Sequence, residues 1–151
     1  MSRQGRDRKE DFNDSMRLFR ITMENPIGMQ DYVVWFHYGW LLWQHEEKIP
    51  EAAEAFYRAG RLSGHKADLY HLESLRHLAH MQYLLGNLED AYQTIQKALA
   101  MDGHHATLYD AARYAARTDR PQESLRLLEA CIRMQPTTIV SMFAEEDFVG
   151  P

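Results

Sequence analysis

Apolar residues recur along this chain at intervals of three and four positions, the period of an α-helix that buries one face. No run of β-branched residues alternates with polar ones, so the pattern gives no indication of strands. Glycine and proline fall between the periodic stretches, where helices end. We therefore expect an all-α protein of about eight helices, joined by short turns that make neighbouring helices antiparallel.

Residues with known turn and capping preferences mark the ends of these stretches. Pro50 and Pro121 suit the first turn of a helix, Asp68 can cap one, and "NPIG" at residues 25–28 should stop the first. The second stretch is apolar nearly all round, so it should be covered on more than one side. The expected helices span residues 8–23, 29–46, 50–62, 68–85, 88–101, 106–117, 121–134 and 139–148.

Three of these helices share one pattern of small and large residues. A small residue is followed four positions later by a larger apolar residue, and three positions further by another small one. The last two occurrences lie 33 residues apart and the first two 39 apart. Small residues let paired helices approach closely, so we expect all nine positions to be buried. They are Ala52, Phe56 and Ala59, then Ala91, Ile95 and Ala98, and then Ser124, Leu128 and Cys131.

The middle unit, "AHMQYLLGNLEDAYQTIQKALAMDG" at residues 79–103, resembles the second half of a tetratricopeptide repeat, a helix-turn-helix unit of about 34 residues. The outer units depart from the family pattern. In the first, Gly39-Trp40 and Trp43 stand where the family has its small and aromatic residues. Glu47 in the first unit and Asp119 in the third stand where the family has a turn glycine.

The resemblance covers about residues 33–136 and implies a right-handed α-solenoid of antiparallel helix pairs. It divides one structural domain into three parts. Residues 1–28 form a tail and capping helix, residues 29–136 form three helix pairs, and residues 137–151 form a C-terminal capping helix.

Both ends of a solenoid need capping helices. The N-terminal helix should cover the surplus aromatic face of the next helix; the alternative is a homodimer through that aromatic helix, which holds Trp35 and Trp43. The capping face consists of Phe12, Met16, Phe19 and Met23. On the last helix, we expect Ile139, Met142 and Phe143 to point inward.

The charge and composition narrow the functional classes. A net charge of −5 argues against a nucleic-acid binder, because phosphate recognition requires clustered Lys and Arg. The first twenty residues hold no apolar run typical of a secretory signal, and the most apolar stretch, residues 32–43, is too short for the roughly 20 residues that span a membrane. A single cysteine excludes an internal disulfide and fits a reducing compartment. We expect a cytoplasmic protein.

No pattern in the sequence indicates catalysis or a cofactor. His77 and His80 can share one helical face and His104 and His105 are adjacent, but a zinc site needs three or four convergent ligands and no HExxH motif is present. We therefore expect no metal site, although a metal or small-molecule binder remains a rival interpretation. Cys131 occupies a small position of the repeat, so we expect it to be buried and unreactive.

The resemblance also implies a binding surface, because the first helix of each pair lines a concave groove in the family. Arginines in this region of an acidic chain favour an acidic partner segment, since a guanidinium pairs with a carboxylate bidentately. In the alternative interpretation the arginines are solvated, and Glu73 and Asp110 neutralise two of them. The predicted groove residues are His37, Leu41, Gln44, Arg76, His80, Tyr83, Tyr109, Arg113 and Arg117.

These observations predict a non-enzymatic scaffold that binds another protein through an extended or acidic segment. The family's carboxylate clamp uses particular Lys and Asn residues that this sequence lacks, so we do not expect that interaction. Two alternatives remain open from size and charge. One is a chaperone similar to those that hold translocator proteins in type III secretion. The other is a regulatory domain at the N-terminal end of a longer protein.

Overall fold

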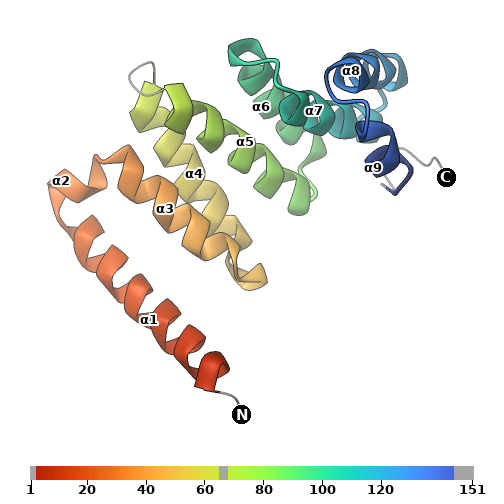
Figure 1. The fold of residues 1–151 in the computed structure, drawn as a ribbon. Helices are drawn as coiled ribbons and strands as arrows, with labels where there is room; N and C mark the ends of the chain where they lie inside the picture. The colour runs from red at the N-terminus through yellow and green to blue at the C-terminus, as the bar shows by residue number, and fades with distance from the viewer. Residues whose placement is uncertain (1–2, 65–67, 145–151) are drawn as a thin grey trace. The chain divides into compact units, whose positions relative to one another are not determined.

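The computed structural model describes residues 3–64 and 68–144, and this part of the chain contains helices but no strand (Figure 1). The predicted all-α class is confirmed. The elements are α1 (Arg3–Glu24), α2 (Pro26–Met29), α3 (Tyr32–Trp43), the 3-10 helix η1 (Glu46–Lys48), α4 (Ile49–Ser63), α5 (Asp68–Leu84), α6 (Leu88–Met101), α7 (His105–Arg117), α8 (Pro121–Met134) and α9 (Thr138–Ala144).

The helix boundaries agree with the sequence where capping and turn residues are clear. Both α6 and α8 have the predicted bounds, and Gly64 caps the C-terminal end of α4. The "NPIG" segment does more than stop α1, because Asn25 accepts a hydrogen bond from the Ile27 N–H and begins the short helix α2. Helix α3 is shorter than predicted, since Asp31 caps it by accepting from the Val33 N–H at 2.9 Å. Residues 145–148 of the predicted last helix lie outside the described residues.

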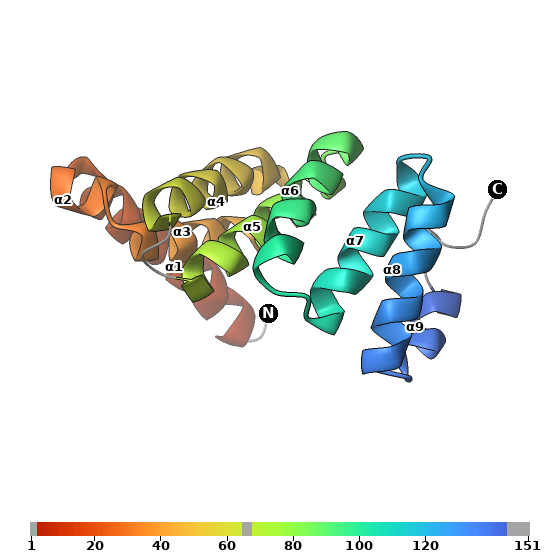
Figure 2. The ribbon, with the colours of Figure 1, turned by 90° about the horizontal axis from the view of Figure 1, so that it is seen from above.

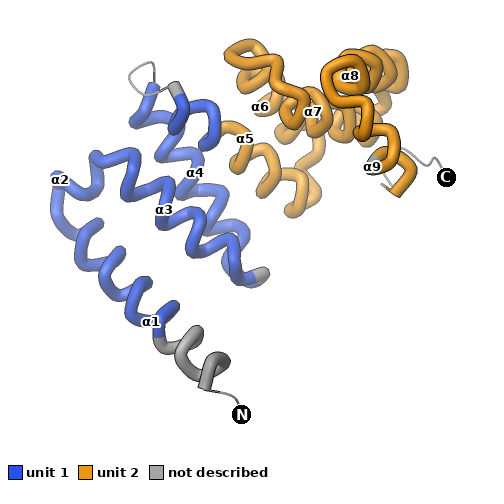
Figure 3. Tube along the Cα trace, viewed as in Figure 1, with its two compact units in different colours: residues 1–74 blue, residues 75–151 orange. Residues whose placement is uncertain are grey.

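The chain forms two compact units, Met1–Ser74 and Leu75–Pro151, with the boundary inside α5 (Figure 3). We refer to them as unit 1 and unit 2. Unit 1 holds α1 to α4 and the start of α5, and unit 2 holds the rest of α5 with α6 to α9.

The core of unit 1, where α3 packs on α4, contains the aromatic side chains of Trp35 and Phe56 beside aliphatic residues and alanines. Phe56 is fully buried. Its ring packs so closely on Gly39 that a Cβ added to Gly39 would lie only 3.0 Å from the nearest ring carbon. Helix α1 packs on α3. The Phe19 ring contacts Tyr38 at a centroid distance of 5.5 Å, and Met16 is buried. The N-terminal helix therefore covers part of the aromatic face, as its apolar stripe predicts.

Alanines dominate the core of unit 2, where α7 and α8 lie side by side in both views (Figure 2). Ala111, Ala112 and Ala115 of α7 are fully buried, and Ser124 of α8 donates a hydrogen bond to the Ala112 carbonyl at 2.9 Å. A side-chain bond of that length across the pair requires a close approach of the two helices. All nine predicted repeat positions are buried, which confirms that the small residues serve packing.

Two sequence predictions about buried faces are wrong. The apolar periodicity of the predicted helix at 68–85 places Leu85 on its buried face, but Leu85 follows the end of α5 and is exposed. On α9, Ile139 and Phe143 are exposed, and Thr138 is buried instead with its hydroxyl 3.5 Å from the Cys131 Sγ. Met142, the third residue predicted to point inward, is half-buried. In the described part of the chain, no helix is long and apolar enough to cross a membrane.

Candidate functional site

The nine predicted groove residues are divided between the two compact units. His37, Leu41 and Gln44 belong to unit 1, and the other six belong to unit 2. In unit 1, His37 is exposed and its ring lies 6.3 Å from that of Tyr70 in an edge-on contact. Leu41 is half-buried, and Gln44 is exposed at the C-terminal cap of α3. These three side chains form no charged cluster, so the candidate site is the set in unit 2.

Two arginines from different helices converge on one carboxylate in unit 2. Arg76 of α5 lies 3.9 Å from Asp110 of α7, and Arg113, one turn along α7, lies 3.8 Å from the other oxygen of the same carboxylate. The three side chains are 25%, 25% and 16% exposed for Arg76, Asp110 and Arg113. We call these three residues the arginine cluster. Asp110 therefore pairs with arginines, as the alternative interpretation of the sequence assigned to it.

Tyrosine rings lie directly beside the arginine cluster. The Arg113 guanidinium sits 5.1 Å from the Tyr83 ring centroid, within range of a cation–π interaction. Tyr83 in turn packs against Tyr114 at 5.2 Å. Tyr114 is fully buried, and burial, with a smaller contribution from Asp110, raises the pKa of its hydroxyl. These contacts hold Arg113 in one orientation, which lowers the entropic cost of using it to bind a ligand.

His80 remains close to the cluster and is electrostatically coupled to it. Its burial lowers the pKa of the imidazole, and the positive charge of Arg113 and the neighbouring His77 lower it further. The His80 ring therefore stays neutral at pH values somewhat lower than an ordinary histidine would. A bound anion would offset the charge of Arg113 and move the pKa of His80 upward.

A cleft of about 350 Å³ opens beside the cluster and is lined by Arg76, Tyr109 and Asp110. The first turns of α7 and α9 supply much of the remaining lining. The volume is at the lower end of the range for small-molecule pockets, and it suffices for a few side chains of a bound segment. Of the predicted groove residues in unit 2, Arg117 lies furthest along α7, where it is exposed at the last residue of the helix.

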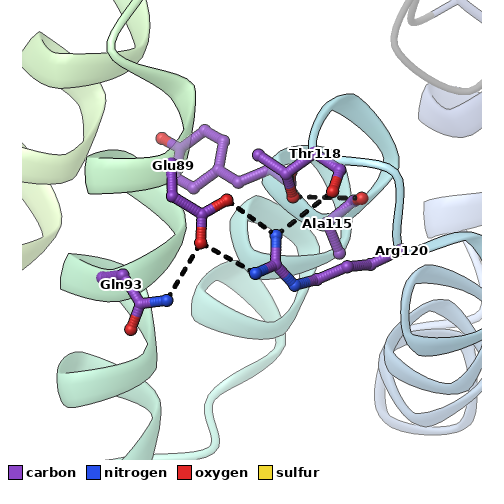
Figure 4. Close-up of polar contacts among 6 residues, drawn as sticks. Glu89, Gln93, Ala115, Thr118 and Arg120 are labelled. Carbon is purple, nitrogen blue, oxygen red and sulfur yellow. Dashed lines mark hydrogen bonds and ion pairs between the residues drawn. The ribbon is translucent and has the colours of Figure 1, made fainter.

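The sequence reasoning missed an ion pair that ties the start of α6 to the turn between α7 and α8 (Figure 4). Arg120 donates to both carboxylate oxygens of Glu89, at 2.9 and 2.7 Å, and also to the Thr118 carbonyl. Gln93 donates to the same carboxylate at 3.1 Å. The Arg120 guanidinium also lies 4.1 Å from the Tyr92 ring centroid. The hydrogen bonds from Arg120 hold the pKa of Glu89 at about 2, well below its usual range.

This pair fixes a turn of unusual backbone conformation. Asp119, which lies between Thr118 and Arg120 in the chain, has a φ of 58°, in the left-handed region. Glu89 and Arg120 are 31 positions apart, so no local spacing rule could have found them. We assign the Glu89–Arg120 pair a structural role. It joins the first turn of α6 to the turn before α8, and its hydrogen bonds involve no residue of the arginine cluster.

The histidines have separate structural surroundings. His104 caps α7, since its Nδ1 accepts a hydrogen bond from the Ala106 N–H at 3.3 Å, and its ring packs on that of His105. His71 of α5 has its Nδ1 2.9 Å from the Gly60 carbonyl of α4. Over residues 3–64 and 68–144, no three His, Cys, Asp or Glu side chains are grouped in a way that could hold a metal ion.

Comparison with known proteins adds no assignment to this geometry. No protein-family model matches the chain, and no curated protein matches it at a significant level. The fold class therefore stands on the helices and the buried repeat positions, and the likeness to tetratricopeptide repeats stays a resemblance.

Proposed function

We propose that this chain is a non-enzymatic, cytoplasmic interaction protein that binds an acidic segment of a partner protein at the arginine cluster of unit 2. The observation that carries the proposal is the convergence of Arg76 and Arg113, from two helices, on the single carboxylate of Asp110. In terms of the resemblance, α5 and α7 are the first helices of the second and third pairs, whose exposed residues line the ligand groove in that family.

The spacing within the cluster favours an incoming carboxylate. Both arginines lie 3.8 to 3.9 Å from Asp110, which is beyond the usual distance of a charge-assisted hydrogen bond. A partner carboxylate can approach to the shorter distance and accept two parallel N–H bonds from one guanidinium. Such a contact replaces a long internal ion pair with a shorter one, and the attraction of Asp110 for the arginines reduces the net gain.

The tyrosines beside the arginine cluster supply the contact area that a protein-binding site needs in addition to charge. Tyr83 and Tyr109 are half-buried, so part of each ring is available for contact while the rest is held by the protein. Tyrosine provides a large contact area at a low cost in side-chain entropy. A segment with carboxylates next to apolar or aromatic residues fits this combination best.

Because Asp110 pairs with both arginines, the proposal predicts opposite effects of removing Asp110 and of removing the arginines. We would measure the binding of a fluorescein-labelled decaglutamate peptide by fluorescence anisotropy. We expect Arg76→Gln/Arg113→Gln to weaken binding about 10- to 100-fold, as the loss of one or two charged hydrogen bonds implies. Asp110→Asn should strengthen binding severalfold, because it removes the carboxylate that competes with the peptide for both arginines.

The control is Lys97→Gln/Arg133→Gln, which makes the same change in net charge at two exposed positions of unit 2. Circular dichroism would check that each variant keeps its helices. If the control weakens binding as much as the arginine variant, the peptide responds to net charge and not to a site. If Asp110→Asn weakens binding, the cluster does not bind the peptide through its arginines and the proposal fails.

A further inference from the structure

A second cleft lies in unit 1, on the surface of α1, and it shares no lining residue with the proposed binding site. Its volume is about 500 Å³. Side chains of α1 form most of its lining, and Lys48, at the end of η1, completes it. We call this the basic cleft. The lining residues that matter here are Phe12, Asp14, Met16, Arg17, Arg20 and Lys48.

Positive charge dominates the basic cleft, although the chain as a whole carries a net charge of −5. Three cationic side chains face one carboxylate. Arg17 reaches Asp14 at 3.4 Å, but both side chains are more than half exposed, so this pair contributes little. Lys48 lies 3.7 Å from Glu51, and Arg20 makes no ion pair with a side chain of the described residues.

The uncharged part of the lining consists of Asn13 and two apolar side chains, Phe12 and Met16. Met16 is buried, and the half-buried Phe12 ring packs on His45 with a centroid distance of 3.7 Å. A ligand that fits this cleft must therefore bring carboxylates for the arginines and an apolar side chain for Phe12 and Met16. An inorganic anion would satisfy only the first requirement.

The chain itself contains a segment with this chemistry. Residues 145–149 read Glu-Glu-Asp-Phe-Val, three carboxylates followed by an aromatic and an aliphatic residue. Residues 75–144 carry seven basic and seven acidic residues, so the acidic surplus of the sequence after residue 74 lies entirely in this segment. The cationic cleft and the acidic segment thus belong to opposite halves of the sequence.

We propose that the basic cleft binds residues 145–149 of a second copy of this chain. Each copy carries one cleft and one segment, so two copies can exchange segments reciprocally. That exchange closes a two-fold symmetric dimer and leaves no unused site. The second contact is made within an existing complex, which raises the strength of the pair above that of either contact alone. The inference is independent of the arginine cluster and stands or falls separately from the proposed function.

The first test measures oligomeric state by sedimentation velocity over a range of concentrations, with the full chain. We expect a dimer for the wild type and a monomer for both Arg17→Glu/Arg20→Glu and Glu145→Lys/Glu146→Lys. Combining all four substitutions swaps the charges of the two surfaces and should restore the dimer. Lys97→Glu/Arg133→Glu, with the same charge change as the cleft variant at other exposed positions, should leave the dimer intact.

The second test measures the contact itself. A labelled peptide with the sequence of residues 144–151, AEEDFVGP, is titrated against the Glu145→Lys/Glu146→Lys chain, whose clefts are vacant under the proposal. We expect binding that weakens at least tenfold in the additional presence of Arg17→Glu/Arg20→Glu. A peptide with serine in place of Phe148 should bind severalfold more weakly, because it lacks the apolar contact.

Each contrary result is decisive. A wild-type chain that stays monomeric at all concentrations overturns the proposal, and if the peptide nevertheless binds, the occupant is not a second copy. A dimer that survives Arg17→Glu/Arg20→Glu, or that the charge swap does not restore, is held by another surface. None of these variants alters Arg76 or Arg113, so the decaglutamate experiment remains an independent test of the proposed function.

Discussion

The two compact units solve one packing problem with different residues. In unit 1, Gly39 of α3 faces the large ring of Phe56 on α4. In unit 2, Ala112 of α7 faces Ser124 of α8, which bonds to its carbonyl. A helix pair can therefore pack closely either by placing no side chain opposite an aromatic ring or by placing two small side chains opposite each other. The first solution buries more apolar area in one residue and depends more heavily on it.

The largest expected effect follows from that dependence. Phe56→Ala should lower the free energy of unfolding by about 3–5 kcal/mol, because it removes a fully buried aromatic side chain and leaves a cavity. Ser124→Ala, at the start of the equivalent pattern in unit 2, should cost only about 0.5–1.5 kcal/mol, the net value of one hydrogen bond. Urea denaturation of both variants measures the difference. Equal losses of unfolding free energy would show that unit 1 does not depend more on one side chain than unit 2 does.

A smaller effect tests the contact between Gly39 and Phe56 directly. Gly39→Ala places a Cβ 3.0 Å from the ring, and the ring cannot yield easily because it is fully buried and packs edge-on against Phe36. We expect a net loss of about 1 kcal/mol, since overpacking costs more than the gain in helix propensity. In the Phe56→Ala background, the same substitution should become stabilising because the clash is gone. A double-mutant cycle by urea denaturation would show this change of sign, and its absence would refute the contact.

The smallest expected effect concerns the exposed pair in unit 2, and it depends on pH. The folded-state pKa of Glu89 is about 2, below its ordinary value of 4.5, so the unfolded chain binds more protons at this site between those values. The stabilisation from Glu89 is therefore fully present above pH 4.5 and is lost as pH falls to 2. Glu89→Gln should be less stable than wild type near pH 7 and equal to it near pH 2, as measured by urea denaturation.

The partner residue provides the control for this prediction. Arg120→Gln should also abolish the pH dependence that Glu89 contributes, and the double variant should cost little more than Arg120→Gln alone, because Arg120→Gln already removes the shared ion pair together with the contacts of Arg120 to Thr118 and Tyr92. A pH-independent difference between wild type and Glu89→Gln would mean that the carboxylate contributes through packing and not through its charge.

Local patterns predicted the helices and the repeat core well, since both depend on spacings of a few residues. The bounds of α6 and α8 and the nine buried repeat positions are examples. The pattern also led to an error on the last helix. It placed Ile139 and Phe143 inward because they share an apolar stripe, but nothing local to α9 specifies how much of that helix the core can cover.

The candidate site was only partly predictable for the same reason. Asp110 and Arg113 are one helical turn apart, so their ion pair follows from spacing, whereas the approach of Arg76 to Asp110 depends on how α5 packs beside α7. The Glu89–Arg120 pair and the burial of Tyr114 depend likewise on tertiary packing. Residues that act together across helices are found from the structure, because no period in the sequence relates them.

The turn at Asp119 has a consequence for how repeats in this chain correspond. Gly86, 33 positions earlier, has a φ of 81°, so two equivalent turns share a left-handed residue although only one of them is glycine. Aspartate tolerates that conformation better than most residues, because its short polar side chain can bond locally. Glutamate lacks this advantage. At the corresponding position of the first repeat, Glu47 lies in the 3-10 helix η1. The turns at Gly86 and Asp119 therefore share a left-handed backbone conformation, and the turn at Glu47 uses a 3-10 helix instead.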